Sequence, residues 1–281
     1  MRFISFDAII KAVELMCLTA AFNLPEDVLQ ALKKARESET SPLGRSILEQ
    51  CLENARIAQT QRVALCQDTG VAVFFVEIGE DVKVEGGHLY EAIQEGTRRG
   101  YQAGFLRKSI VRDPIFDRTN TQDNTPAIIH IDIVSGDKIT IFLAPKGGGA
   151  ENMSALKMLK PLMGKQGVMD FVVDTVVSAG GNTCPPVIVG VGVGGNFEKV
   201  AYLAKKSLLR TIGEKNPDPR YADFEAEILE KINASGLGPQ GLGGVNTALA
   251  VHILTHPCHI ASLPVAVNIN CHSARHAKMV L

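Results

Sequence analysis

The segment PPVIVGVGVGG, residues 185–195, constrains the fold of this chain more than any other. It is apolar at both alternating sets of positions, so the predicted strand is expected to be buried on both faces. The following residues, FEKVAYLAKKSLLR, carry apolar side chains at helical spacing. A buried strand followed directly by a helix is typical of α/β proteins. We therefore expect a mixed α+β arrangement of helices around a small β-sheet.

The glycines of this segment also match a dinucleotide-binding pattern. Gly190, Gly192 and Gly195 fit G-x-G-x-x-G between a strand and a helix. The acidic residue that should end a following strand is missing, because residues 213–219 form a polar loop. Close packing of the helix on the strand is the favoured interpretation of these glycines, and an NAD-binding enzyme is a minor alternative.

The first 60 residues are expected to be helical. Apolar residues recur at helical spacing in FDAIIKAVELMCLTAAF, PEDVLQALKKARES and SPLGRSILEQCLENARIAQTQ, and Pro25 suits a first helical turn. We expect one region over 1–281, with two sub-lobes: a helical one at 1–60 and a mixed α/β one at 61–281.

Several further elements are expected after residue 64. ALCQDTGVAVFFVEIG predicts a turn and a strand, and GGHLYEAIQEGTRRGYQAGF a helix. Residues 126–149 predict a hairpin that turns at Ser135-Gly136-Asp137. Residues 152–178 and YADFEAEILEKINAS predict helices, TALAVHILT a short helix, and LPVAVNIN a strand.

The charge balance and the N-terminus exclude some classes of function. The chain has 29 basic and 30 acidic residues, and nucleic-acid binders need a basic surplus, so no nucleic-acid partner is expected. Asp7, Lys11 and Glu14 interrupt the apolar N-terminus, which predicts an amphipathic helix instead of a signal peptide. With no uninterrupted apolar run of membrane-spanning length, we expect a soluble, cytoplasmic protein without a membrane partner.

The six cysteines fall into two kinds of environment. Cys17 and Cys51 lie on apolar helical faces, where a buried structural thiol is expected. Three others lie at element ends among Gly, Pro, Asn and Thr, where side chains can converge on a site. These are Cys66 in CQDTG, Cys184 in GGNTCPP and Cys271 in NINCHSAR. Without a CxxC pair a zinc ribbon is disfavoured, and composition alone leaves metal ligation and burial about equally open.

Six ordered motifs resemble the α region of the class I fumarase and L-tartrate dehydratase family. They are CQDTG, LRKSIVRDP with RTNTQDNTPA, KGGGAENMSALKML, GGNTCPPVIVGVGVGG, GPQGLGG and NINCHSARH. The resemblance runs from about Glu14 to the C-terminus. It implies a [4Fe–4S] cluster held by Cys66, Cys184 and Cys271. Three cysteine ligands leave one iron free to act as a Lewis acid.

The resemblance also implies roles for residues around the cluster. Gln67 and Asp68 would orient the substrate or move its proton. Without the resemblance, the favoured interpretation of Asp68 is an Asx-turn, in which its side chain bonds to nearby backbone amides. Arg107 would bind a substrate carboxylate bidentately, with Lys108 and Arg112 as nearby alternatives.

Two further site residues are expected. Gly148, in a glycine run before a helix, would contact the substrate. His259 would handle protons near the substrate hydroxyl, although a loop histidine is more often structural. His130, in a predicted strand, is expected to be structural.

The expected activity is reversible hydration of fumarate to (S)-malate, a step of the tricarboxylic acid cycle, without redox change. Family members continue into a β region that carries further basic residues and the residue proposed as base. We therefore expect a β subunit as partner, in an α2β2 assembly that acts on a small dicarboxylate. L-tartrate dehydration is the first alternative, and a non-enzymatic iron–sulfur or redox-sensing module is the second.

Overall fold

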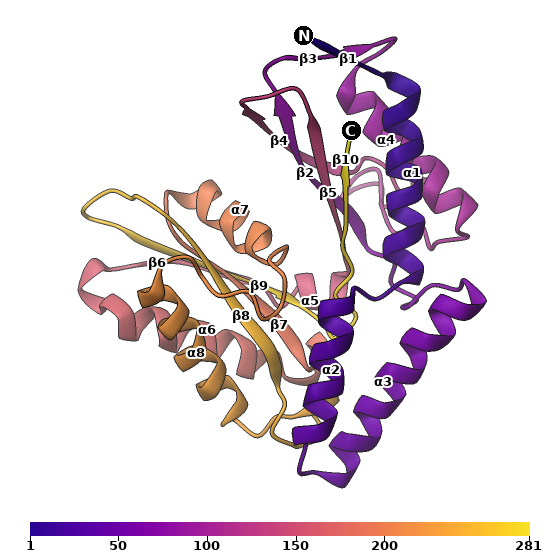
Figure 1. Ribbon diagram of the computed structural model, residues 1–281. Coiled ribbons are helices and arrows are strands. Elements are labelled where there is room, and N and C mark those ends of the chain that lie inside the picture. The colour runs from indigo at the N-terminus through magenta and orange to yellow at the C-terminus, as the bar shows by residue number, and fades with distance from the viewer. The chain divides into compact units, whose positions relative to one another are not determined.

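The computed structural model describes residues 1–281, and the chain divides into two compact units (Figure 1). Each unit has its own hydrophobic core. The segment 1–60 does not form a lobe of its own, because its first and second helices bury their apolar faces in different units. Unit 1 consists of Met1–Pro25, Ala55–Gly148 and Arg275–Leu281, and unit 2 of Glu26–Asn54 and Gly149–Ala274.

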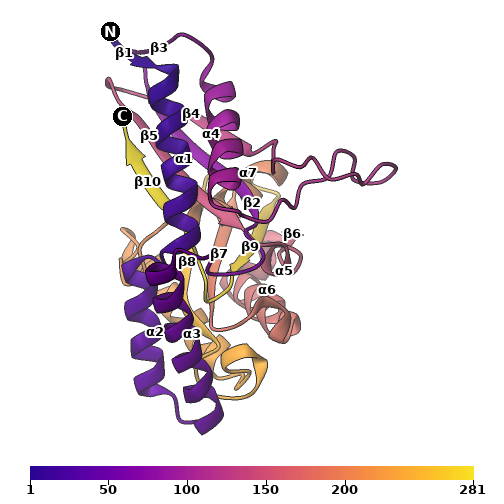
Figure 2. The same ribbon diagram turned by 90° about the vertical axis from the view of Figure 1, so that its right-hand side faces the viewer.

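Unit 1 is a mixed four-stranded sheet with two helices on one face. Helices α1 (Phe6–Phe22) and α4 (Leu89–Ala103) lie side by side against it (Figures 1 and 2). A Cβ on Gly100 would lie 2.6 Å from Cys17 Cβ, so glycine permits this close approach of the helices. The strand order in this sheet is β10-β5-β2-β4. The strands are β2 (Val71–Gly79), β4 (Ile128–Val134), β5 (Ile139–Lys146) and β10 (Ala277–Val280). Strands β1 (Arg2–Ser5) and β3 (Val82–Glu85) form a separate parallel pair.

The hairpin predicted over residues 126–149 is wrong. Strands β4 and β5 do not pair with each other; both pair with β2, which lies between them. The run VAVFFV in β2 is apolar at both sets of alternating positions, which suits a central strand. The turn at Ser135-Gly136-Asp137 connects β4 to β5 past the end of β2, where Gly79 N donates to Lys138 O.

Unit 2 is a second four-stranded sheet, with helices on both faces. Helix α7 (Phe197–Ser207) covers one face, and α6 (Gly164–Ala179) and α8 (Pro219–Asn233) cover the other (Figure 1). The order is β6-β9-β7-β8, with β6 (Ala155–Leu159), β7 (Val187–Gly194), β8 (Ala248–His256) and β9 (Leu263–Asn270). The remaining elements are α2 (Glu26–Ser38), α3 (Pro42–Gln61), α5 (Gly148–Glu151) and the 3-10 turns Pro161–Met163, Gly180–Thr183 and Pro239–Gly241.

Strand β7 confirms the prediction of a buried strand, and α7 confirms the helix that follows it. A Cβ on Gly190 would lie 2.2 Å from Ala204 O, and one on Gly192 would lie 2.2 Å from Val200 O. Both contacts are far shorter than van der Waals distance, so the helix can approach the strand only because glycine stands there. Close packing therefore explains these glycines.

Two predicted helices in unit 2 are partly or wholly strands. The predicted helix at 152–178 begins with β6, which pairs with β9, and only the part from Gly164 is helical. TALAVHILT contains most of β8, not a helix. Short apolar runs do not distinguish the two structures, and pairing with a neighbouring strand decided both cases.

The stretch Phe6–Ser38 is apolar and long enough to cross a membrane by length and composition, and half of its most apolar window is buried inside the protein. Helix α1 contributes Ile9, Ile10 and Val13 to the core of unit 1. A buried core helix meets the same criterion, so this stretch needs no membrane to explain its composition.

Candidate active site

The loop Cys66–Gly70 of unit 1 connects α3 to β2 and carries three of the predicted site residues. Gly70 has a φ of +77°, and a Cβ there would lie 2.6 Å from the carbonyl carbon of Lys146. Only glycine lets this loop lie against the backbone of Lys146 and Gly147. Two segments that are distant in the sequence, CQDTG and KGGG, are thereby joined.

The carboxylate of Asp68 is fixed by two backbone amides. Gly70 N donates to Oδ1 at 3.1 Å, which is the predicted Asx-turn. Gly148 N donates to Oδ2 at 2.7 Å, so the glycine run holds Asp68. The N–H of Gly148 is thus already donated within the chain. We infer that Gly148 orients Asp68, and that a substrate contact there would have to use another atom.

Arg107 is brought beside the same loop through its main chain. Thr69 Oγ1 donates to the carbonyl of Arg107 at 2.7 Å. The Arg107 side chain is exposed and makes no hydrogen bond or ion pair, so its guanidinium is available for a ligand. Unit 1 therefore places the main chain of Arg107 beside the loop that carries Cys66, Gln67 and Asp68.

Two residues that the sequence analysis did not single out support this loop. Tyr101, which is buried, donates from its hydroxyl to the carbonyls of Thr69 and Gly70, at 3.0 and 3.1 Å. Burial raises the pKa of Tyr101 far above its ordinary value, so the hydroxyl remains a donor. Asn124 donates to Gly70 O at 3.1 Å and accepts from Ser109 N at 2.7 Å. Asn124 lies in the motif RTNTQDNTPA, and this motif was the feature of the sequence that could have identified it.

The chain between α4 and β4 extends away from the sheet of unit 1 (Figure 2). Arg112 N donates to Thr119 O at 2.9 Å, and Asp113 Oδ1 accepts from Ile115 N at 2.8 Å. The neighbouring Arg112 charge helps to lower the pKa of Asp117, after the hydrogen bonds from Thr119. Arg112 thus belongs to the extended arm, which makes Arg107 the better placed of the two.

Unit 2 brings Cys184 and Cys271 to one end of its sheet. Cys184 precedes β7 and Cys271 follows β9, and these antiparallel neighbours pair Ile188 with Asn270. His272 N donates to Cys184 O at 3.3 Å, and His272 Nδ1 lies 3.0 Å from the same oxygen. The turns that carry the two cysteines are therefore hydrogen-bonded to each other.

The glycine-rich loop 236–246 supports this pair of turns. Gln240 Nε2 donates to Pro185 O at 3.0 Å and lies 3.1 Å from His272 Nδ1. Glu39 anchors the other end of the loop, because its buried carboxylate accepts from the backbone N–H groups of Val245 and Asn246. Glu39 carried no recognisable signal in the sequence.

The two helical cysteines are buried, as predicted. Burial raises the pKa of the Cys17 thiol to about 12 and that of Cys51 to about 11. The charges of Cys271 and Cys184 also raise the pKa of Cys51, which shows that Cys51 lies near the pair. Its proximity to the candidate site was not foreseen.

His259 is not assembled with Cys184 and Cys271. It lies in the turn between β8 and β9, where its Nδ1 accepts from Ala261 N at 3.1 Å. Strand β9 runs from this turn to Cys271 over eight residues, roughly 23 Å at the usual rise of an extended chain. Within unit 2, His259 and the two cysteines are therefore at opposite ends of the sheet.

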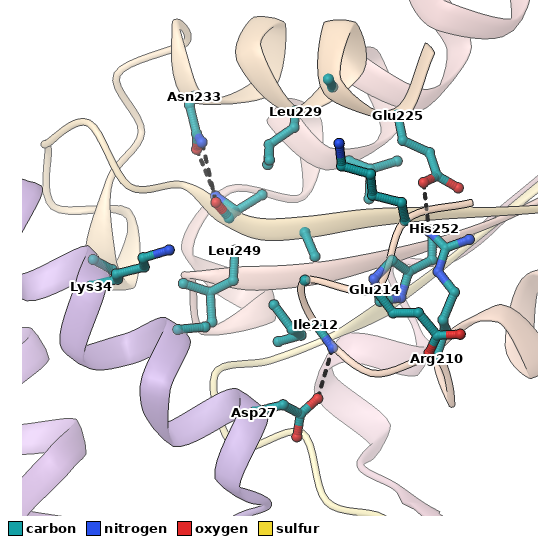
Figure 3. A pocket seen from close by; sticks show the side chains of 18 of the residues that line it. Asp27, Lys34, Arg210, Ile212, Glu214, Glu225, Leu229, Asn233, Leu249 and His252 are labelled. Atoms are coloured by element: carbon teal, nitrogen blue, oxygen red, sulfur yellow. Dashed lines mark hydrogen bonds and ion pairs between the residues drawn. The ribbon is translucent and has the colours of Figure 1, made fainter. Parts of the chain in front are cut away.

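A separate cavity of about 1100 Å³ runs along the edge strand β8 between α2 and α8 (Figure 3). Asn233 accepts from Ala248 N, and Glu225 accepts from Ile253 N, so side chains cover this edge of the sheet. Glu225 also pairs with Arg210 at 2.5 Å. None of the predicted site residues lines this cavity.

The buried His252 lies on the same strand and lines the cavity (Figure 3). Burial and the nearby Arg210 charge lower the pKa of His252 to about 4. The imidazole is therefore neutral at physiological pH.

The candidate ligands fit an iron–sulfur cluster in their chemistry. None of the six cysteines forms a disulfide, and Cys66, Cys184 and Cys271 lie outside the cores, in loops. Thiolates are the usual ligands of such clusters. Cys66 belongs to unit 1 and the other two to unit 2, and within neither unit are three His, Cys, Asp or Glu side chains grouped to hold a metal ion.

Comparison with known proteins gives a consistent result over almost the whole chain. The family described as Fumarate hydratase (Fumerase) matches residues 10–280. A Methanocaldococcus jannaschii protein named "Putative L(+)-tartrate dehydratase subunit alpha" is 45% identical over 262 residues, 92% of each chain. The L(+)-tartrate dehydratase subunit alpha of Escherichia coli K12 is 34% identical over 266 residues, 92% of this chain and 86% of that protein.

Proposed function

The chain belongs to the fumarate hydratase family of iron–sulfur hydro-lyases as an α subunit, and we propose that its reaction is the reversible hydration of fumarate to (S)-malate. The observation that carries the proposal is that the turns of Cys184 and Cys271 lie at one end of a sheet, hydrogen-bonded to each other and outside the hydrophobic core. Cys184 is exposed and Cys271 partly so, which suits metal ligation better than packing.

In this proposal Cys66, Cys184 and Cys271 hold a [4Fe–4S] cluster. When bound, a cluster with three protein thiolates supplies an open iron that acts as a Lewis acid on a substrate oxygen. The ligand turns need rigid support for this role. The hydrogen bonds of His272 and Gln240 around Cys184 supply that support in unit 2.

Unit 1 supplies the groups that bind and orient the dicarboxylate. The free, exposed guanidinium of Arg107 can grip a carboxylate with two parallel hydrogen bonds. Asp68 presents a carboxylate held in place by Gly70 and Gly148, and it can accept a proton from the water that adds to fumarate and return it to the departing hydroxyl in the reverse reaction. The exposed amide of Gln67 lies next to it in the chain and can orient the same hydroxyl.

A β subunit completes the enzyme in this proposal. The relatives are named as α subunits, and the family resemblance assigns further basic residues and the carbon base to a β region. His259 lies far from the cysteines within unit 2, and its predicted role in proton transfer stays a prediction. We propose an α2β2 assembly that binds a small dicarboxylate.

Kinetics of the reconstituted two-subunit enzyme test the proposal. The cluster-loaded α chain alone should show almost no hydratase activity, and adding the β subunit should produce it. Arg107→Ala should lower kcat/KM for fumarate by about tenfold to a hundredfold, because hydrogen bonds to charged groups contribute about 1.5–3 kcal/mol. Arg112→Ala is the matched control. Unchanged kcat/KM in Arg107→Ala would place the carboxylate elsewhere.

L-tartrate dehydration is the second candidate, and the names of the relatives favour it. The motifs DPIFDRTNTQDNTPA and NCHSARH resemble the fumarase branch more closely, and the matching family is described as fumarate hydratase. Comparing kcat/KM for fumarate, (S)-malate and L-tartrate on the same preparation separates the two. A clear preference for L-tartrate would replace the first candidate by the second.

A further inference from the structure

A buried arginine supports the loop that carries Cys66. Arg275 begins the last segment of unit 1 and is 4% exposed. Its Nη2 donates to the carbonyl of Asp68 at 2.7 Å. That carbonyl lies two residues after Cys66, so Arg275 fixes the backbone of the loop from inside the protein.

The positive charge of Arg275 has no ion-pair partner in the chain. No carboxylate forms an ion pair with it, and its Nε and Nη1 are buried without a hydrogen-bond partner. The Asp68 carboxylate keeps its negative charge, but it accepts from the backbone N–H groups of Gly70 and Gly148 and forms no ion pair with Arg275; the nearby Tyr101 hydroxyl is neutral. Buried charges in proteins are normally paired, because an unpaired one costs several kcal/mol. The chain therefore provides a buried cation here without an anion in direct contact with it.

Arg210 shows what a largely buried arginine with a carboxylate partner looks like in the same protein. Its Nη2 pairs with the Glu225 carboxylate at 2.5 Å, although its Nε is also without a partner. The difference between the two arginines is the missing carboxylate at Arg275. A guanidinium keeps its charge at every physiological pH, so deprotonation cannot relieve the imbalance.

We infer that Arg275 is a positioning residue whose buried positive charge is balanced by the anionic, thiolate-ligated iron–sulfur cluster that Cys66 helps to hold. This inference rests on the proposed function. Because Nε and Nη1 are shielded, the charge acts across the loop through the low-dielectric interior and needs no direct contact. Cluster and arginine then stabilise each other, while the cluster-free protein bears the cost of an unpaired buried charge.

Thermal unfolding of Arg275→Met, with and without the cluster, tests this reciprocity in the full chain. Without the cluster, the variant should unfold at the wild-type temperature or higher, because an unpaired charge has been removed. With the cluster, it should unfold at a lower temperature than the loaded wild type. Arg275→Lys keeps the charge and should retain most of the rise that loading produces. Arg210→Met, the matched control, should lower both temperatures equally.

Iron release to a chelator gives a second readout that does not depend on activity. Arg275→Met should release iron about tenfold faster, which corresponds to about 1.4 kcal/mol of lost charge attraction. If Arg275→Met fails to fold, Arg275→Gln carries the same comparison, because glutamine retains a donor for the Asp68 carbonyl.

The two hypotheses fail differently. Equal loss of thermal stability in both forms, or an unchanged rate of iron release, would show that Arg275 has a structural role only and would overturn the inference. Failure of the wild-type chain to take up a cluster, judged by visible absorbance and iron content, would overturn the proposed function as well.

Discussion

Replacing Glu39 with Gln should destabilise the protein strongly. Glu39 is 1% exposed, and its carboxylate accepts from Thr40 N, Ser41 N, Val245 N, Asn246 N and Asn246 Nδ2, at 2.9–3.2 Å. A glutamine has the same shape but turns one of the two acceptor oxygens into a donor. The change therefore tests the hydrogen bonds of the carboxylate, not its packing.

The magnitude follows from the distribution of these bonds. If the amide nitrogen replaces Oε2, both Asn246 donors lose their acceptor; if it replaces Oε1, Thr40 N and Ser41 N do. In either orientation, two N–H groups that donated to the carboxylate now face the NH2 group of the glutamine. At about 1.5–3 kcal/mol for each bond to a charged group, the loss should be roughly 3–6 kcal/mol. Total stabilities of domains are about 5–15 kcal/mol, so the effect is large.

The pH dependence of this contribution has a definite sign. Burial alone would raise the pKa of Glu39, but the hydrogen bonds from Ser41, Asn246 and Val245 outweigh it and lower the pKa below its ordinary value of 4.5. A carboxyl group with a lowered pKa in the folded state stabilises the protein above the unfolded pKa. The difference between wild type and Glu39→Gln should therefore be complete above pH 4.5 and shrink as the pH falls further.

Urea unfolding followed by circular dichroism measures the effect, with the exposed neighbour Glu37→Gln as the control. Glu37→Gln should lie within about 0.5 kcal/mol of wild type. A loss below about 1 kcal/mol for Glu39→Gln at pH 7 would refute the reasoning. Because Glu39 anchors the loop whose Gln240 supports the Cys184 turn, Glu39→Gln should also retain less cluster after reconstitution.

Three further predictions concern the cysteines, His252 and the glycines of β7. Cys184→Ser and Cys271→Ser should abolish the cluster absorbance, whereas Cys17→Ser should keep it; full retention in Cys184→Ser contradicts the ligand assignment. His252, with its pKa lowered from 6.5 to about 4, should lose about 3 kcal/mol of stability as the pH falls between these values, since the unfolded state binds the proton first. His252→Gln should lack this slope in pH-dependent urea unfolding. Gly192→Ala should cost at least about 1–3 kcal/mol, measured by urea unfolding, because its Cβ would lie 2.2 Å from Val200 O; wild-type stability would argue against tight packing of α7.

Local patterns in the sequence were sufficient for most helices and for the central strands. The helical periodicity of FDAIIKAVELMCLTAAF matches α1, and PPVIVGVGVGG and LPVAVNIN match β7 and β9. These segments follow one period over many residues or are apolar throughout, so local preference and tertiary burial agree. The motif CQDTG likewise identified the Asp68 loop, because Gly70 has a positive φ that favours glycine.

Only the tertiary structure decided which segments meet. The sequence could not show that β2 inserts between β4 and β5, that the ends of β7 and β9 bring Cys184 beside Cys271, or that His259 lies at the other end of that sheet. Glu39 and Arg275 were missed for the same reason: a carboxylate or a guanidinium acquires its role from the distant backbone that surrounds it. Strand pairing and the burial of a charge depend on which distant surfaces pack together in the fold. A single sequence shows the residues involved but not which of them come into contact.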